Sequence, residues 1–390
     1  MADDAQTLDR LNLMLDRIRA HPFYAGCLPS RMDTLEAFAA QVPLMTKADL
    51  QAEMAKPGFG AMAPHVPVQR MNMTPVGRGL MPVLSSRGDI EQMVAACRSH
   101  LDICGIGPGD TCLITFGYHL FVAGLFYQTQ MEAQGVATIP HGPGDPARIA
   151  QICRDHHVTV LAGNPSFALK AIAEGMPPPR VFFAGGEPFT GNKTLYAAVR
   201  AAMPDTLLID AFSLSEVLPV ARTVPGGTGV HVFDERVHAE VIDPETLTPV
   251  PDGTRGELVL THLTKELMPL VRYRTGDLTV MQRTAPVHGR TVCLPQVVFG
   301  RTDQMVKVKG VKLFPSEIGS LLLGIPGLTG KYALTLAPGD KIALCLEGTA
   351  APESCEAISA AFKTQTLLSL DDLTTVERLP DGPTLTDKRS

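Results

Sequence analysis

The sequence predicts an α/β fold: a large N-terminal domain with parallel sheets flanked by helices plus a distorted β-barrel subdomain, and a small mobile α+β C-terminal domain. Between residues 111 and 216, strand and helix patterns alternate about every 20 to 25 residues, and the strand segments are apolar on both faces. Such strands are typical of a parallel sheet covered by helices. After residue 216, short strands separated by turn signals predict the barrel. From residue 316, helix and strand patterns return over about 80 residues, enough for a small domain.

The individual elements follow from local patterns. Residues 8–20 place apolar side chains at helical spacing, which predicts an amphipathic helix. Thr46 and Asp49 have the spacing of a capping box and predict a short helix. Residues 56–79 are rich in Gly, Pro and Met, which favours a loop. The alternating region contains predicted helices at 89–103, 120–135, 146–157, 166–175 and 192–204, and predicted strands at 111–116, 136–140, 158–163, 180–187 and 206–216.

The segment from residue 256 to residue 318 is the most unusual in the chain. Its first part predicts strands at 256–263 and 268–274, with a charged turn at residues 272–277. Its second part combines Gly300, Gly310 and several charged residues within eleven positions. Because glycine and charge are rarely so dense in a core element, the segment is predicted to hold a nucleotide and to contain a hinge. The predicted domains are residues 1–302 and 303–390.

Composition limits the possible function classes. The net charge is −6 and no block of Lys and Arg is present, which disfavours a nucleic-acid binder. The first residues lack the apolar core of a signal peptide, and no apolar run approaches the roughly 18 residues of a membrane span. We therefore expect a soluble cytoplasmic protein with no nucleic-acid or membrane partner, while a homodimer stays open. None of the eight cysteines forms a CxxC pair, which favours free buried thiols.

Ligands on a parallel sheet collect beyond the carboxyl ends of its strands. The loops that follow the predicted strands are residues 117–119, 164–166, 185–187 and 213–216. All four are rich in Gly or small polar residues, and we expect them to form the rim of a ligand site.

Four segments resemble, in order and spacing, the adenylate-forming (acyl-CoA synthetase) superfamily, and most closely its phenylacetate–coenzyme A ligase family: residues 181–187, 210–216, 256–277 and 300–318. The resemblance implies an ATP-dependent carboxylic acid–CoA ligase. Such an enzyme uses ATP and Mg²⁺ to convert a carboxylic acid, here an aryl or small organic acid, to an acyl-adenylate with release of pyrophosphate. The small domain then rotates, and the thiol of coenzyme A takes the acyl group.

The resemblance also implies residue roles. Glu216 is the expected Mg²⁺ ligand, and Ser215 is expected near the α-phosphate. Lys388 is expected to act in adenylation, Lys309 in thioester formation, and Asp303 at the hinge. The nucleotide site is expected to comprise Gly185, Gly186, Glu187, Asp210, Phe212, Asp277 and Arg301, with Thr74 and Arg78 at the phosphates, and the acyl pocket to comprise Tyr118, Phe121 and Gly186.

One segment departs from the family pattern. The phosphate-binding loop of the family is rich in Ser, Thr and Gly and ends in Gly-Lys, whereas Pro75 here has no N–H to donate and no Lys follows Gly79. Two alternatives therefore stay open. One is an adenylating enzyme that passes the acyl group to an amine or a carrier protein. The other is a non-catalytic relative that binds an adenylate.

Overall fold

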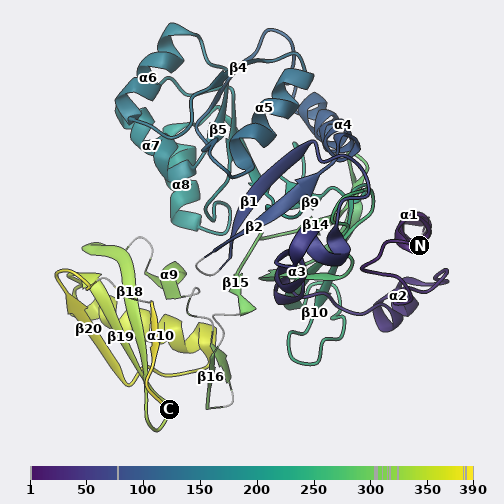
Figure 1. Cartoon of the computed structure of the whole chain (residues 1–390). Coiled ribbons are helices and arrows are strands. Elements are labelled where there is room, and N and C mark those ends of the chain that lie inside the picture. The colour runs from purple at the N-terminus through teal and green to yellow at the C-terminus, as the bar shows by residue number, and fades with distance from the viewer. Residues whose placement is uncertain are drawn as a thin grey trace. The chain divides into compact units, whose positions relative to one another are not determined.

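The computed structural model describes residues 2–76, 79–302, 306–309, 311–313, 315, 318–322, 325–380, 382 and 384–389 (Figure 1). The chain divides into two compact units. The first comprises Met1–Thr190, Leu195–Thr275 and Thr279–Val297, and the second comprises Gly191–Thr194, Gly276–Leu278 and Val298–Ser390. Of the predicted site residues, Arg78 and Asp303 lie outside the described residues.

A nine-stranded sheet forms the frame of the first unit. Its order is β13-β14-β9-β8-β7-β6-β5-β3-β4, and the five strands from β7 to β4 are parallel. These parallel strands are β3 (Thr111–Ile114), β4 (Ala137–Pro140), β5 (Val160–Gly163), β6 (Val181–Ala184) and β7 (Leu207–Phe212). The predicted parallel sheet is confirmed. Strands β4 and β5 end where predicted, whereas β3, β6 and β7 end two to four residues earlier.

Helices cover both faces of the parallel strands, and Figure 1 shows α6, α7 and α8 on one side of β5 and α4 and α5 on the other. Successive strand residues point to opposite faces. In β6, Val181 and Phe183 enter the hydrophobic core beneath α4 and α5, whereas Phe182 and Ala184 enter the core beneath α6, α7 and α8. The helices are α4 (Arg87–Ile103), α5 (Ala123–Ala133), α6 (Pro146–Asp155), α7 (Pro165–Ala173) and α8 (Lys193–Ala202).

The segment predicted as a distorted barrel forms two antiparallel groups. The first group extends the parallel sheet through β8 (Ala221–Arg222), β9 (Val230–Val232), β14 (Arg290–Leu294) and β13 (Gln282–Val287). The second group is a four-stranded sheet in the order β10 (Val237–Ile242), β11 (Arg255–His262), β12 (Tyr273–Val280) and β15 (Gly300–Arg301).

Two predictions around residue 272 were wrong. The charged stretch predicted as a turn is the start of β12, because its charge is paired across the sheet: Arg274 donates to Glu257 on β11 at 2.6 Å. The preceding residues 268–272 form no strand, although they are apolar. Their backbone is held by the hydroxyl of Tyr24, which donates to the Pro269 carbonyl and accepts from the Val271 N–H.

The predicted loop at residues 56–79 was also wrong in part. Residues Pro57–Met62 form a 3₁₀ segment, and β1 (Arg70–Val76) pairs with β2 (Gly79–Ser85) in an antiparallel hairpin. Along β1 the polar residues Asn72 and Thr74 are buried and Met71 is exposed. This inverted alternation explains why the strand is missed when apolar residues are assumed to point inward.

The N-terminal helices are α1 (Ala2–Ile18), α2 (Leu35–Gln41) and α3 (Lys47–Met54). The predicted capping box at α3 is confirmed, since the Thr46 hydroxyl accepts from the Asp49 N–H and the Asp49 carboxylate accepts from the Thr46 N–H. All eight cysteines are free thiols, and five of them are buried. Among the described residues, no helix has both the length and the apolar character needed to cross a bilayer.

The second unit is a helix-covered sheet in the order β20-β19-β18-β21. Its strands β18 (Leu328–Ala337) and β19 (Lys341–Gly348) are antiparallel, whereas β20 (Asp372–Val376) and β21 (Leu385–Asp387) run parallel to their neighbours. Helix α10 (Pro352–Thr366) packs Ile358 and Phe362 onto the sheet. The hairpin of β16 (Val306–Val308) and β17 (Val311–Leu313) and the short α9 (Ile318–Leu321) complete the described part, and β21 was missed from the sequence.

Ser86 caps α4 and makes a tertiary contact as well. Its hydroxyl accepts from the Asp89 N–H and donates to Glu266 at 2.6 Å. We expect Ser86→Ala to lower the free energy of unfolding of the first unit by about 1–2 kcal/mol in urea titrations. Thr34→Ala, which removes an exposed cap of α2, should cost less, about 0.5–1 kcal/mol. Equal losses in the two variants would contradict a stabilising Ser86–Glu266 contact.

Candidate active site

The parallel sheet has a switch point at β3, which lies between β4 and β5. A crevice forms outside the carboxyl ends of strands at such a point. There the Asn164 side chain donates to the Gly185 carbonyl at 3.1 Å. A Cβ atom on Gly186, whose φ is +81°, would lie 2.5 Å from Asn164 Nδ2, and one on Gly185 would lie 3.5 Å from the Phe116 ring. Gly186 therefore lets the backbone approach Asn164 closely, whereas a Cβ on Gly185 would make only an ordinary van der Waals contact with Phe116.

The two predicted acyl-pocket aromatics have different environments. Tyr118 packs against the core beneath α4 and α5, and its hydroxyl is buried with no hydrogen-bond partner among the described residues. Phe121 is 38% exposed. A Cβ atom on Gly124 would lie 3.0 Å from the Tyr118 ring, so this glycine provides room for Tyr118.

Glu187 and Asp210, which are predicted to bind the nucleotide, form hydrogen bonds to loops at the same edge of the sheet. The Glu187 carboxylate accepts the Ser166 N–H at 2.7 Å, at the N-terminus of α7. The buried Asp210 carboxylate accepts from the N–H and the hydroxyl of Thr190 at 2.9 and 2.6 Å. Burial raises the pKa of Asp210, and the Thr190 hydrogen bonds oppose that shift. The neighbouring Phe212 is half-buried and packs against the core around β10 and β11.

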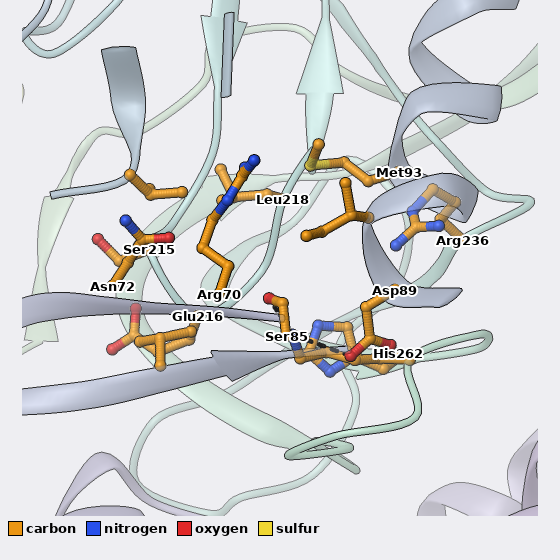
Figure 2. Close-up of a pocket in the computed structure, with 14 residues that line it drawn as sticks. Arg70, Asn72, Ser85, Asp89, Met93, Ser215, Glu216, Leu218, Arg236 and His262 are labelled. Atoms are coloured by element: carbon orange, nitrogen blue, oxygen red, sulfur yellow. Dashed lines mark hydrogen bonds and ion pairs between the residues drawn. The ribbon is translucent and has the colours of Figure 1, made fainter. Parts of the chain in front are cut away.

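Ser215 and Glu216 follow β7 and line a cavity together with Arg70 and Asn72 of β1 (Figure 2). Glu216 is buried, with 6% of its surface exposed. Its Oε1 atom lies 3.2 Å from Lys47 Nζ, and it accepts from the Tyr273 hydroxyl at 3.4 Å. The structure thus brings the predicted metal ligand together with Lys47, which the sequence interpretation missed. Lys47 is the first residue of the capped helix α3, so its placement depends on that cap.

His262 and Lys265 line the same cavity and were also missed as site residues. Both come from the segment that the sequence singled out, but neither has a local motif. The His262 Nδ1 atom accepts the Leu270 N–H at 3.0 Å, and its ring also hydrogen-bonds to the Glu216 backbone. Burial, followed by the nearby cations Lys265 and Arg236, holds the pKa of His262 well below its usual range. The imidazole is therefore neutral around pH 7.

The predicted phosphate-binding residue Thr74 lies in β1, and its partner in that prediction, Arg78, lies outside the described residues. Thr74 is buried and pairs with Met81, and Pro75 pairs with Leu80. Asn72, next along β1 on the same face, donates to the carbonyls of Leu120 and Phe121 at 3.4 and 3.3 Å. The hairpin is thereby attached to the loop before α5.

The predicted ribose residue Asp277 and Arg301 contact each other in the second unit. They face one another across β12 and β15, and Arg301 donates to the Asp277 carboxylate at 2.9 Å. Asp277 is buried, with 6% of its surface exposed, while the Arg301 side chain is 39% exposed.

The two predicted catalytic lysines are exposed on the second unit. Lys309 follows β16 with φ +51°, and its N–H bonds to the Asp340 carboxylate at 3.2 Å. Lys388 follows β21, and its N–H bonds to the Leu336 carbonyl. Arg389 links the two regions, because it donates to the Lys307 carbonyl and to Asp340.

Comparisons with known proteins agree with this arrangement. Residues 86–264 match the AMP-binding enzyme family. A phenylacetate–coenzyme A ligase of Thermus thermophilus is 30% identical over 81% of this chain and 74% of its own length. One of Aromatoleum evansii is 32% identical over 77% of this chain and 70% of its own length. A crystal structure of a 2-hydroxyisobutyryl-CoA ligase in the postadenylation state shares the fold, with a TM-score of 0.80, 24% identity, and coverage of 99% of this chain and 90% of that one.

The chain therefore belongs to the phenylacetate–coenzyme A ligase family of AMP-binding enzymes. The family resemblance, the mixed α/β fold class and the assignment to the AMP-forming acid–thiol ligases are confirmed. The individual roles of the site residues stay predictions.

Gly186 offers a direct test of the close approach at the sheet edge. Gly186→Ala combines left-handed backbone strain with a clash against Asn164, so we expect adenylation to fall at least tenfold and the melting temperature to fall. Gly226 has a similar φ of +78°, but a Cβ there would meet nothing within 4 Å. Gly226→Ala carries the strain alone, about 1 kcal/mol, and should retain activity. Equal activity of the two variants would contradict a site at Gly186.

His262 gives a pH prediction. Because its pKa is lowered on folding, the unfolded chain binds more protons below about pH 6.5, and stability falls as pH falls. We expect this residue to contribute a loss of up to about 1.4 kcal/mol per pH unit below pH 6.5. Urea titrations at pH 7.5 and 5.5 should show a shallower pH dependence for His262→Gln than for the wild type. An unchanged dependence would show that His262 is not buried in its neutral form.

Proposed function

We propose that this enzyme is an ATP-dependent carboxylic acid–CoA ligase whose active centre lies at the carboxyl edge of the parallel strands. The observation that supports this best is the cavity at Ser215 and Glu216, where the loop after β7 meets the polar face of β1. The substrate is an aryl or small organic acid, and the cosubstrates are ATP and coenzyme A.

In the first half-reaction, a carboxylate oxygen of the acid bonds to the α-phosphorus of ATP and pyrophosphate leaves. Both reactants are anions, so the barrier falls when cations and hydrogen-bond donors are held around the phosphorus. In our proposal, Ser215 donates to the α-phosphate and Lys388 contacts the acid and the α-phosphate. Gly185, Gly186, Glu187, Asp210 and Phe212 border the adenine.

Glu216 fits a Mg²⁺ ligand of the kind found in phosphoryl-transfer sites. Mg²⁺ there is held by one or two carboxylates, together with substrate phosphates and water. Within the described ranges, no cluster of three or more His, Cys, Asp and Glu side chains could hold a metal ion. A bound Mg²⁺ would neutralise phosphate charge, and Glu216 would exchange its contact with Lys47 for the ion.

The β1–β2 hairpin and the Asp277–Arg301 pair complete the proposed nucleotide site. Pro75 cannot donate to phosphate, so the proposed donors are Thr74 and Arg78. Asp277 accepts from the ribose hydroxyls and Arg301 reaches the ribose or a phosphate, which requires their mutual contact to open. Tyr118, Phe121 and Gly186 border the acyl group.

In the second half-reaction, the coenzyme A thiol loses its proton to solvent and its sulfur bonds to the acyl carbon. The bond from that carbon to the phosphate oxygen breaks, and AMP leaves with its electron pair. We propose that residues 303–390 rotate against residues 1–302 about Asp303 between the two steps. Lys388 would then leave the site and Lys309 would enter it. Both lysine segments are attached to Asp340. The Lys309 N–H donates to its carboxylate, and so does Arg389, the residue after Lys388. These shared contacts support movement of the two segments as one body.

Acid-dependent ATP–pyrophosphate exchange with phenylacetate, benzoate and butyrate tests the proposed function. We expect exchange with at least one acid, followed by consumption of coenzyme A. Absence of exchange with every acid, together with measurable AMP binding, would instead indicate an adenylate-binding relative without turnover. Adenylate formation without coenzyme A consumption would identify an amine or a carrier protein as the acceptor.

The two lysines should separate the half-reactions. We expect Lys388→Ala to lower adenylation at least a hundredfold, and Lys309→Ala to impair thioester formation instead. Both half-reactions are measured separately, the second with supplied acyl-adenylate. Lys363→Ala, on the exposed surface of α10, is the matched control and should change neither. Loss of both half-reactions in Lys388→Ala would contradict its assignment to the first step.

A cytoplasmic location and the absence of nucleic-acid and membrane partners stay predictions of this proposal, and a homodimer stays open.

A further inference from the structure

Lys47 is an accessible cation at the proposed active centre. Its Nζ atom lies 3.2 Å from Glu216 Oε1, and its side chain is 37% exposed, whereas the side chain of Glu216 is 5% exposed. The protein therefore encloses the carboxylate but leaves its cationic partner open to solvent. A molecule that enters the site can contact Lys47 without any rearrangement of the core.

The backbone at Lys47 is fixed by neighbouring contacts. The Met45 N–H donates to the Arg272 carbonyl at 3.0 Å, and the Met45 carbonyl accepts from the Arg274 N–H at 2.8 Å. These two bonds attach the segment before α3 to β12. The capping box at Thr46 then fixes the first turn of α3, in which Lys47 is the first residue. The ammonium group thus starts from a rigid backbone, while the flexible stem of a lysine lets it change partners.

Helix α3 adjoins the β1–β2 hairpin, which carries the proposed phosphate donor Thr74. The two elements contact each other through α3 and β2. Leu50 of α3 is buried in the same hydrophobic core as Met81 and Leu84 of β2. Lys47 therefore belongs to an element that packs directly against the proposed phosphate site.

The described part of the hairpin supplies no positive charge at this site. Thr74 is a neutral donor, and Pro75 has no N–H to donate. Arg236 lies near Glu216, but it is buried, and the cavity that it lines has a volume of about 30 Å³, room for about one water molecule. A phosphate group cannot enter that cavity. Lys47 is the cation that the structure places at ion-pair distance from Glu216 and also leaves accessible.

We propose that Lys47 binds the phosphates of ATP that leave as pyrophosphate. In the structure its ammonium group pairs with Glu216. When Glu216 contacts Mg²⁺, Lys47 loses that partner and donates to a β- or γ-phosphate oxygen instead. As the bond from the α-phosphorus to the bridging oxygen breaks, its electron pair stays with pyrophosphate, and the charge of Lys47 stabilises this leaving group. The proposal rests on the proposed ligase activity and adds a phosphate-binding residue to it.

Calorimetric titrations of the intact enzyme with ATP and with AMP, both in the presence of Mg²⁺, test this proposal. We expect Lys47→Met to lower the affinity for ATP at least about tenfold, through loss of one charge-assisted hydrogen bond, and the affinity for AMP less than about twofold. Lys47→Arg keeps the charge and should retain more of the ATP affinity. An unchanged ATP affinity in Lys47→Met, or an equal fall for ATP and AMP, overturns the proposal.

A Glu216→Gln background separates direct phosphate binding from a role exercised only through Glu216. If Lys47 served only to neutralise Glu216, its removal would have no effect once that charge is absent. We expect the loss of ATP affinity caused by Lys47→Met to persist in the Glu216→Gln enzyme. Disappearance of the loss in this background overturns the phosphate contact.

Lys56 supplies the matched control. It lies two residues after the end of α3 and pairs with Glu53 at 2.6 Å, and its side chain is 58% exposed. Lys56→Met therefore removes the same charge from a second lysine–glutamate pair of the same region. It should leave the affinities for ATP and AMP unchanged. An equal fall of ATP affinity in Lys56→Met overturns the assignment to Lys47.

Lys47→Gln keeps the test decisive if Lys47→Met does not fold. The Gln amide can still donate to Glu216, but it carries no charge for a phosphate. We expect Lys47→Gln to lower the affinity for ATP and to leave the affinity for AMP unchanged. Retention of the wild-type ATP affinity in this variant overturns the proposal.

Acid-dependent ATP–pyrophosphate exchange separates this proposal from the proposed function. ATP binding that depends on Lys47, in an enzyme that shows no exchange with any acid, supports the phosphate contact and counts against the ligase activity. Exchange in which Lys47→Met leaves the KM values for ATP and pyrophosphate unchanged supports the ligase activity and overturns the role of Lys47.

Discussion

The buried carboxylate of Asp89 is the contact on which the geometry of the first unit depends most. It accepts the Ser86 N–H at the start of α4 and the N–H groups of Glu266 and Leu267 after β11, and Lys265 lies 4.0 Å away. Each partner offsets the cost of burying a charge, and together they join two segments that are far apart in sequence. The walls of the cavity at Ser215 and Glu216 are set by this contact, since α4 and the segment after β11 both contribute to its lining.

Charged residues at the proposed site contact each other in the structure. Glu216 is paired with Lys47, and Asp277 with Arg301. A nucleotide or a cation must replace these contacts, so binding is an exchange of partners in which only the difference in interaction energy counts. Arg236 is the exception, because two of its buried donors have no partner in the described part of the chain. Glu216 and Asp277 are thus held in place by partners within the protein, whereas the environment of Arg236 favours a further hydrogen-bond acceptor.

Much of the fold follows from short-range patterns in the sequence. The parallel strands were predicted because both of their faces are buried, and the cap of α3 because Thr46 and Asp49 are close in the chain. The wrong predictions share a long-range cause. The charges of residues 272–277 are neutralised on another strand, and the polar residues of β1 point into a cavity. Lys47, His262 and Lys265 join the site through tertiary contacts alone, so no local motif indicates them.

The two hydrophobic cores on opposite faces of the sheet restrict where residues can be inserted or deleted during evolution. Adding one residue within β6 would exchange Phe182 and Phe183 between the cores, because strand side chains alternate, and both packings would fail together. Adding a residue after Ala184 would shift only the loop that contains Gly185 and Gly186. Insertions and deletions that survive selection should therefore fall in the loops at the carboxyl edge, so that new acid specificities can arise there while the sheet keeps its register.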